Sequence, residues 1–319
     1  MLRYILQRLG LIVLTMFIVI TINFFLLRLM PGTPFDNPKI TPAQKELMMR
    51  KYNLDDPAVV QYVRYMGNLL KGDFGVSFKL QDQPVLKLIS QRLPHTVKIG
   101  SIALVFGVLM GIFLGALAAI YKNSLWDHAA TIFAVVGVSI PSFVLAALLQ
   151  HYIVAELGWF TYLYNPVDPT RGISRWDSFY SSILPSFSLS LFVISATMRY
   201  MRSELVEVLN SDYILLARAK GLNKAQVIIR HALRNSLIPV VTIIGPMAIS
   251  LMTGSLVIEM FYGVPGLSRL MINAISQNDY FLILGVNAFY SLLFVTIVLI
   301  IDLLYGVIDP RIRLRGGKA

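Results

Sequence analysis

Six long apolar runs divide the chain, and polar segments separate them. They cover approximately residues 9–27, 99–121, 129–149, 178–198, 237–258 and 281–301, and all are nearly free of charged residues. Each run is long enough to cross about 30 Å of hydrocarbon as a helix, which takes roughly 20 residues. The pattern therefore predicts an all-α membrane protein with six transmembrane helices.

The first apolar run has two interpretations, a cleaved signal peptide or a retained helix. Arg3 and Arg8 precede it, as in a signal peptide, but no small-residue cleavage site follows it. We therefore interpret it as the first membrane helix. Six crossings place both termini on one side, and the short loops of that side hold far more Lys and Arg than those opposite. This bias predicts that both termini are cytoplasmic.

The same pattern predicts three parts of the chain. Residues 1–29 are a basic arm and the first membrane helix, and residues 30–98 are a helical extracytoplasmic loop domain. Residues 99–319 are a five-helix core with a cytoplasmic loop at about residues 199–236. This division leaves one substantial polar domain outside the membrane and one long basic loop on the cytoplasmic side.

Two short helices are predicted in the extracytoplasmic domain. Thr41 followed by Pro42, with Gln44 three positions after Thr41, is typical of a capped helix start. A second helix is predicted to begin after Asp56-Pro57. Its periodicity places one set of apolar residues along one face, namely Val59, Val63, Met66 and Leu70.

Small residues and prolines mark the membrane runs. Gly107, Gly111 and Gly115 recur every four residues, which predicts a groove for close helix packing, with a gate as the alternative. Proline is predicted to interrupt or bend the later helices, at Pro141, Pro185 and Pro246. Serines beside these prolines have two interpretations: a polar path, or hydroxyls bonded back to their own helix. They are Ser139, Ser142, Ser186, Ser188 and Ser190.

Composition narrows the function classes. The chain is 56% hydrophobic and 14% charged, has no cysteine, and carries a net charge of +11 that flanks the apolar runs. This distribution argues against nucleic-acid binding. It is typical of loops that face the cytoplasmic leaflet of a membrane. No Walker lysine, no His-Glu-x-x-His and no Gly-x-Ser-x-Gly occurs, so no catalytic or metal site is predicted. No ionisable residue lies centrally in any run, which argues against a proton-coupled carrier.

The basic loop predicts a helix–turn–helix. A helix is expected from Asp212 to Lys220, and Gly221 is suited to end it because glycine adopts the left-handed conformation without strain. Asn223 and Gln226 fit the two positions of a capping box. The apolar side is predicted from Ile214, Leu215, Val227, Ile228 and Leu233. Two roles stay open for this segment, binding to the anionic leaflet and docking of a cytoplasmic partner.

The motifs resemble a known family. Leu215-Leu216-Ala217-x-x-x-Gly221 is similar to the "EAA" loop of membrane subunits from binding-protein-dependent ABC importers, although Leu215 stands where Glu is usual. The run ARAKGL followed by RHALRN resembles the peptide-importer branch. Further matches run along the chain in order: PGTPF at 31–35, KGDFGVSFK at 71–79, IPSF at 140–143, TGS at 253–255 with Glu259, GVPGL at 263–267, NDY at 278–280 and DPR at 309–311.

The resemblance is greatest to the B-type membrane subunit of oligopeptide permeases, and it implies the type I ABC importer transmembrane fold in a bacterial or archaeal plasma membrane. Dipeptide, nickel and glutathione permeases share most of the pattern. The implied partners are a second homologous six-helix subunit, two cytoplasmic ATPases that carry ATP and Mg, an extracytoplasmic binding protein, the peptide and membrane lipid. No cofactor is implied on this chain.

The resemblance also implies site residues. The ATPase-coupling contact is expected at Leu215, Leu216, Ala217, Arg218, Ala219, Lys220, Gly221 and Leu222. Translocation-pathway residues are expected at Ser139, Ser142, Met247, Ser250 and Thr253. A stand-alone ion-coupled carrier and a membrane enzyme or scaffold are the competing function classes. The sequence has no central ionisable residue for a proton-coupled carrier and no catalytic constellation for an enzyme, whereas a sodium site built from carbonyl and hydroxyl groups stays open.

Overall fold

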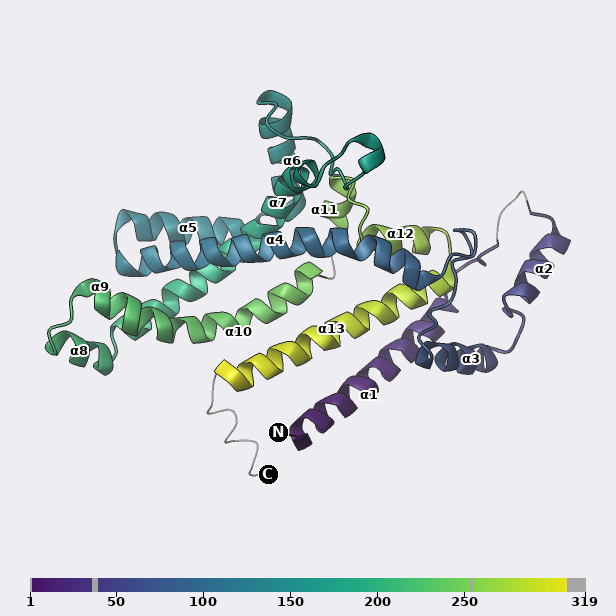
Figure 1. The fold of residues 1–319 in the computed structure, drawn as a ribbon, viewed down its shortest axis with the longest axis horizontal. Coiled ribbons are helices and arrows are strands. Elements are labelled where there is room, and N and C mark those ends of the chain that lie inside the picture. The colour runs from purple at the N-terminus through teal and green to yellow at the C-terminus, as the bar shows by residue number, and fades with distance from the viewer. Residues whose placement is uncertain (1, 36–39, 253–254, 309–319) are drawn as a thin grey trace. The chain divides into compact units, whose positions relative to one another are not determined.

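The structure is a computed structural model that describes residues 2–35, 40–252 and 255–308, and these residues fold into helices joined by short connections (Figure 1). No β-strand forms within these ranges. The contacts divide the chain into two compact units, Met1–Pro94 with Gly266–Thr296, and His95–Pro265 with Ile297–Ala319. Two of the three divisions fall inside the long helices α4 (Val85–Ile120) and α13 (Tyr280–Ile308), and the third falls in the loop before Leu267. Each unit is described here by itself.

The first unit contains the helices at the beginning of the chain and one segment near its end. They are α1 (Leu2–Leu27), α2 (Pro42–Lys51), α3 (Ala58–Leu70), the start of α4 (Val85–Ile120), α12 (Leu267–Ser276) and the start of α13 (Tyr280–Ile308). Figure 1 shows α1 running beside α13, and the amide Nδ2 of Asn287 donates to Oδ1 of Asn23 at 3.2 Å. Phe24, Tyr65, Val85 and Leu267 lie in its apolar core.

The local helix signals in this unit are confirmed. Thr41 and Gln44 form the expected capping box at the start of α2. Helix α3 begins at Ala58, as expected, and three residues of its predicted apolar face are exposed: Val59, Val63 and Leu70, at 64%, 63% and 87%. Tyr65 supplies the buried contact instead. Aromatic side chains reach further than valine and pack against the neighbouring helix.

The second unit holds the remaining helices. They are the rest of α4, α5 (Leu125–Ser139), α6 (Ser142–Leu149) with the π-helical η1 (Gln150–Glu156), the 3₁₀ turn η2 (Pro169–Arg171), α7 (Arg175–Leu209), α8 (Asp212–Ala219), α9 (Lys224–Gln226), the π-helical η3 (Val227–Ala232), α10 (Leu233–Met252) and α11 (Leu256–Phe261). Helix α7 is the centre of this unit, and α4, α5, α6 and α10 pack around it.

Five described helices are long and apolar enough to cross a membrane, and there are six if α5 and α6 count as one broken span. The third predicted run is not one straight helix, since α5 and α6 with η1 meet at 103°. Pro141 causes the break, because Ile140 before it is extended and proline offers no N–H to the helix. The interruptions predicted at Pro185 and Pro246 were wrong, since both prolines lie inside continuous helices.

Helices α4 and α7 extend furthest beyond the apolar runs that predicted them. Helix α4 begins at Val85 rather than near residue 99, and α7 continues to Leu209 rather than ending near residue 198. The additional turns contain charged residues such as Arg92 and Glu204, which lower local hydropathy without opposing helix formation. Hydropathy therefore located the part of each helix suited to hydrocarbon and missed its polar ends.

Candidate functional site

The predicted helix–turn–helix of the basic loop is present, and its turn is closed by backbone bonds. Gly221 has a φ of +80°. Its N–H donates to Arg218 O at 2.9 Å, and the N–H of Leu222 donates to Ala217 O at 3.3 Å. This pair of bonds is the Schellman motif, which ends a helix through a residue in the left-handed conformation. Glycine is the residue that adopts this conformation without strain.

The second helix of the hairpin starts at the predicted cap. The N–H of Gln226 donates to Oδ1 of Asn223 at 2.9 Å, and the N–H of Asn223 donates to Oε1 of Gln226 at 3.1 Å. These reciprocal bonds satisfy two donors that would otherwise face solvent at the helix start. The chain then continues through η3 into α10 (Figure 1). Both ends of the turn are thus fixed by local chemistry.

One side of the hairpin is packed against the ends of the long helices. Ile214 and Val227 are buried, and they share an apolar cluster with Met201 and Leu205 of α7 and with Val240 of α10. The apolar side predicted from the sequence is correct at Ile214 and Val227 and wrong at Leu215. Leu215 lies on the opposite face of α8, where 66% of it is exposed. The hairpin is therefore held to the membrane helices by one face and presents the other outward.

The eight residues expected at the coupling contact separate into two groups. Ala217 is buried in the cluster just described, and Leu222 is half-buried. The other six form the outward surface of the hairpin: Leu215, Leu216, Arg218, Ala219, Lys220 and Gly221. This surface combines two exposed leucines with two cations. A partner that fits it needs an apolar contact area bordered by acidic groups.

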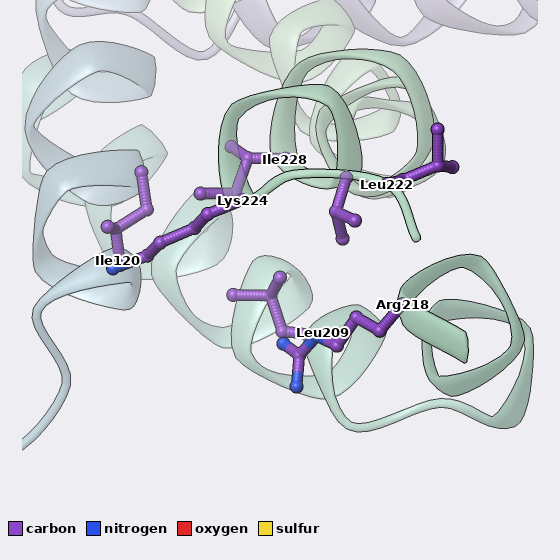
Figure 2. Close-up of a pocket in the computed structure, with 7 residues that line it drawn as sticks. Ile120, Leu209, Arg218, Leu222, Lys224 and Ile228 are labelled. Carbon is purple, nitrogen blue, oxygen red and sulfur yellow. The ribbon is translucent and has the colours of Figure 1, made fainter. Parts of the chain in front are cut away.

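A cavity of about 410 Å³ opens where the hairpin meets the ends of α4 and α7 (Figure 2). Its apolar walls come from Ile120, Leu209, Leu222, Val227 and Ile228. Arg218 and Lys224 also line it, and they are the charged residues of its lining. Of the eight expected coupling residues, Arg218 and Leu222 are thus brought together in one cavity. The cavity therefore resembles the outward surface, because both combine apolar side chains with positive charge.

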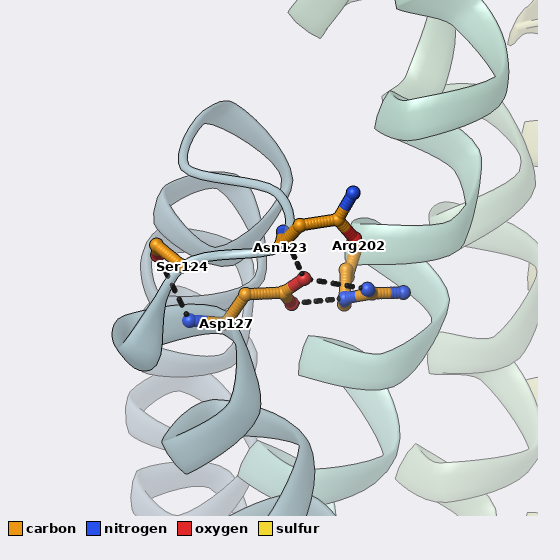
Figure 3. A network of polar contacts seen from close by, with 4 residues as sticks. All are labelled: Asn123, Ser124, Asp127 and Arg202. Carbon is orange, nitrogen blue, oxygen red and sulfur yellow. Dashed lines mark hydrogen bonds and ion pairs between the residues drawn. The ribbon is translucent and has the colours of Figure 1, made fainter.

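An ion pair that the sequence did not indicate ties the α4–α5 turn to α7 (Figure 3). Nη2 of Arg202 lies 2.8 Å from Oδ2 of Asp127, and the Asp127 side chain is buried. The N–H of Asn123 donates to the same carboxylate at 2.9 Å, and Ser124 caps α5 by accepting from the N–H of Asp127. Ser124 and Asp127 have the spacing of a helix cap, which was visible in the sequence, but nothing local pointed to Arg202.

The glycine groove of α4 receives α7. A Cβ added at Gly111 would lie 2.6 Å from Cβ of Thr197 and 2.8 Å from Ile194 O. At Gly107 the nearest atom would be Cβ of Val193 at 2.6 Å, and at Gly115 it would be the carbonyl oxygen of Met198 at 2.5 Å. The three glycines thus allow the two helices to approach closely within one chain.

The expected pathway residues are spread over three segments. Ser139 ends α5 and donates its hydroxyl back to Val135 O at 2.8 Å, and Ser142 begins α6. Met247 and Ser250 lie on α10, half-buried and exposed respectively. Thr253 lies outside the described residues. Their role in a pathway stays a prediction.

Back-bonding, one of the two interpretations offered for the α7 serines, is observed for two of them, and a polar path stays a prediction. Ser188 and Ser190 donate back to Leu184 O and Phe187 O, each at 2.8 Å, and Ser188 also lies 3.1 Å from the hydroxyl of Tyr262. Ser186 is buried, and its hydroxyl has no hydrogen-bond partner among the described residues. Back-bonding therefore accounts for two of the three hydroxyls.

Two sequence motifs that lie far apart along the chain meet in the first unit. Asp279 is buried, and its carboxylate accepts from the hydroxyl of Ser77 and from the N–H groups of Phe78 and Lys79. The same carboxylate accepts from the N–H of Leu282, in the first turn of α13. Asp279 therefore caps this helix and fixes the preceding KGDFGVSFK segment at once.

Comparisons with known proteins give sequence matches along nearly the whole chain. Residues 111–314 match the family described as "Binding-protein-dependent transport system inner membrane component", and residues 1–100 match its N-terminal counterpart. The dipeptide transport system permease protein DppB of Lactococcus lactis is 42% identical over 314 residues, covering 98% of this chain and 100% of that protein. The oligopeptide transport system permease protein OppB of Haemophilus influenzae is 40% identical, with the same shares covered.

A solved structure supports the fold independently. A chain of the MetNI methionine ABC transporter aligns with a TM-score of 0.55 at 16% sequence identity, covering 71% of this chain and 99% of that chain. At this identity the likeness concerns the fold alone, and the fold is that of an ABC transporter's membrane-spanning part. It confirms the fold class expected from the six apolar runs.

Proposed function

The chain belongs to the family of binding-protein-dependent transport system inner membrane components, and from that premise we propose that it carries oligopeptides across the membrane by coupling to ATPases on separate subunits. It is a multi-pass inner-membrane protein, a permease subunit of a peptide ABC importer. The relatives that support the peptide substrate match nearly the whole chain.

The assembly proposed around this subunit has four kinds of chain. A second homologous six-helix subunit completes the translocation pathway, two cytoplasmic ATPases hold ATP and Mg, and an extracytoplasmic binding protein delivers the peptide. Both termini and the helical hairpin face the cytoplasm in this arrangement, as the Lys and Arg bias predicts. The catalytic chemistry then belongs to the ATPases, and this chain contributes the path and the coupling.

The observation that carries the coupling proposal is the two-sided hairpin. Its inner face is fixed to α7 and α10 through Ile214 and Val227, so a force on the hairpin is passed to those helices. Its outer face offers Leu215, Leu216 and two cations to a partner. A packed element of this kind transmits a two-state motion from the ATPases to the membrane helices, because packed cores shift between discrete arrangements rather than deform continuously.

The coupling proposal is tested at Gly221. Its φ is +80°, and a Cβ added there would meet no atom within 4 Å. Gly221→Val would therefore act through the backbone alone, since a left-handed conformation costs an L-residue about 1–2 kcal/mol and is least tolerated by β-branched side chains. Gly221→Asn is the matched control, because asparagine adopts this conformation readily.

The assay uses the whole transporter in proteoliposomes, with peptide uptake and ATP hydrolysis measured together. We expect Gly221→Val to insert and assemble but to lose peptide uptake, while Gly221→Asn retains most of it. Normal uptake by the valine variant would refute the coupling role. Uptake by this chain alone, without any ATPase, would instead support an ion-coupled carrier.

Dipeptides are the second candidate substrate, because the dipeptide permease of L. lactis is as similar to this chain as the oligopeptide permeases are. Competition of labelled pentapeptide uptake by dipeptides, glutathione and nickel separates the cases. Competition by longer peptides alone supports the oligopeptide assignment. Competition by dipeptides, glutathione or nickel assigns that substrate in its place.

A further inference from the structure

Helix α3 packs against the last turns of α1 through its aromatic residues. The hydroxyl of Tyr62 lies 2.7 Å from Oγ1 of Thr21, and the ring of Tyr62 lies 5.5 Å from that of Phe25. The ring of Tyr65 stacks on Phe24 at 6.1 Å. These contacts fix which part of α1 lies beside α3. They therefore set the depth of α3 relative to the membrane that α1 crosses.

The contact with α3 lies within the apolar window of α1, before that window ends. The apolar window of α1 covers Gly10–Leu27, and Thr21 lies six residues before its end. At 1.5 Å of rise per residue, this places Thr21 about 9 Å inside the window. Arg28 follows the window, and its guanidinium binds Gln61 of α3 and lies 5.1 Å from the centroid of the Phe24 ring. An arginine in this position reaches the polar headgroup level.

The face of α3 that points away from α1 is apolar. Val59 and Val63 are largely exposed, and Leu70 is the most exposed of the three. This face continues the exposed apolar surface of α1, because Phe25, itself 42% exposed, contacts Tyr62 beside Val63. The apolar window of α1 is only 17% buried within the described residues, so the two helices share one exposed apolar surface near the end of that window.

We propose that α3 is an interfacial helix, and that Val59, Val63 and Leu70 contact lipid acyl chains in the leaflet nearest the end of α1. Charged groups occupy a different side of the helix, where Arg64 pairs with Asp56 at 2.8 Å. An amphipathic helix with this division lies in the plane of the interface, with its apolar face buried about 5–10 Å. The height of Thr21 agrees with that depth.

The test places one fluorescent label at a time on this helix. Since the chain has no cysteine, Val63→Cys and Leu70→Cys each give a single labelling site for bimane. Arg64→Cys is the matched control, one residue away and on the charged side. Each variant is reconstituted with the whole transporter in lipid whose acyl chains carry bromine either near the headgroup or near the bilayer centre, and aqueous iodide is the water-side quencher.

We expect the labels at 63 and 70 to lose fluorescence with bromine near the headgroup, to lose less with bromine at the bilayer centre, and to resist iodide. The label at 64 should show the reverse preference, with iodide quenching strongest. Equal iodide quenching at 63 and 64 would overturn the proposal, because the face would then be in water. Protection of 63 and 70 from both quenchers would also overturn it and assign the face to a protein partner.

Discussion

Gly111 offers the sharpest test of how the second unit is held together. Gly111→Ala adds one Cβ on the face of α4 that meets α7, where it would lie 2.6 Å from Cβ of Thr197, 2.8 Å from Ile194 O and 3.1 Å from Met198 N. Two of these three atoms belong to backbone inside a long helix and cannot turn aside. The helices must therefore separate, and other contacts between them must lengthen.

The expected loss of stability is estimated relative to a glycine at which an added Cβ would contact no other atom. A Cβ at Gly67 in α3 would meet no atom within 4 Å, so Gly67→Ala gains only the helix preference of alanine, about 0.5–1 kcal/mol. Gly111→Ala gains the same preference but suffers overpacking of about 1–3 kcal/mol. The difference between the two variants should therefore be about 1–3 kcal/mol, with Gly111→Ala the less stable.

The assay is unfolding of the purified subunit in mixed micelles of increasing SDS fraction, followed by circular dichroism, with peptide uptake measured on the same variants in proteoliposomes. Stability of Gly111→Ala equal to or above that of Gly67→Ala would refute the packing argument. Lost uptake at unchanged stability would instead support the alternative that this groove is a gate.

Two further predictions concern buried carboxylates. Arg202→Gln should destabilise the chain by about 3 kcal/mol, because it leaves the buried Asp127 carboxylate without its ion-pair partner. Asp127→Asn should cost less, because the Arg202 side chain is 31% exposed and water can solvate its charge. The double variant should lose less than the sum in the same SDS titration, and strict additivity would show that the pair is not coupled. Asp279→Asn should cost about 1–3 kcal/mol in the first unit, since the charge that accepts from Ser77 and the N–H of Phe78 is removed. Unchanged trypsin cleavage after Lys79 would contradict that expectation.

Features that a few consecutive residues determine could be predicted from the sequence. The hairpin turn is one case, because Gly221 and the Asn223–Gln226 box are fixed by backbone conformation and neighbouring hydrogen bonds. The break at Pro141 is another, because the missing N–H acts within one helical turn. In both cases the physical cause lies within about four residues of its effect.

Features that depend on distant residues could not be predicted in this way. Periodicity found the apolar face of α3 but gave no sign that this face is exposed, because an apolar stripe alone does not tell what covers it. Arg202 gave no local sign of its partner. Leu215 was assigned to the wrong side of α8 because it and Ile214 are adjacent and equally apolar, and only packing shows which of the two is buried. Only the packed chain distinguishes such alternatives.

The bond between Ser77 and Asp279 has a consequence for the order in which the protein is made. The two residues are 202 positions apart, yet both are buried in the first unit. At a synthesis rate of about 5–20 residues per second, the first segment waits roughly 10–40 seconds for its partner. Throughout that time the surface that will bury Val85 and Leu88 has no α12 or α13 to cover it. Synthesis of the subunit thus includes an obligatory partly folded stage. During that stage the insertion machinery and the surrounding lipid must cover the apolar surface.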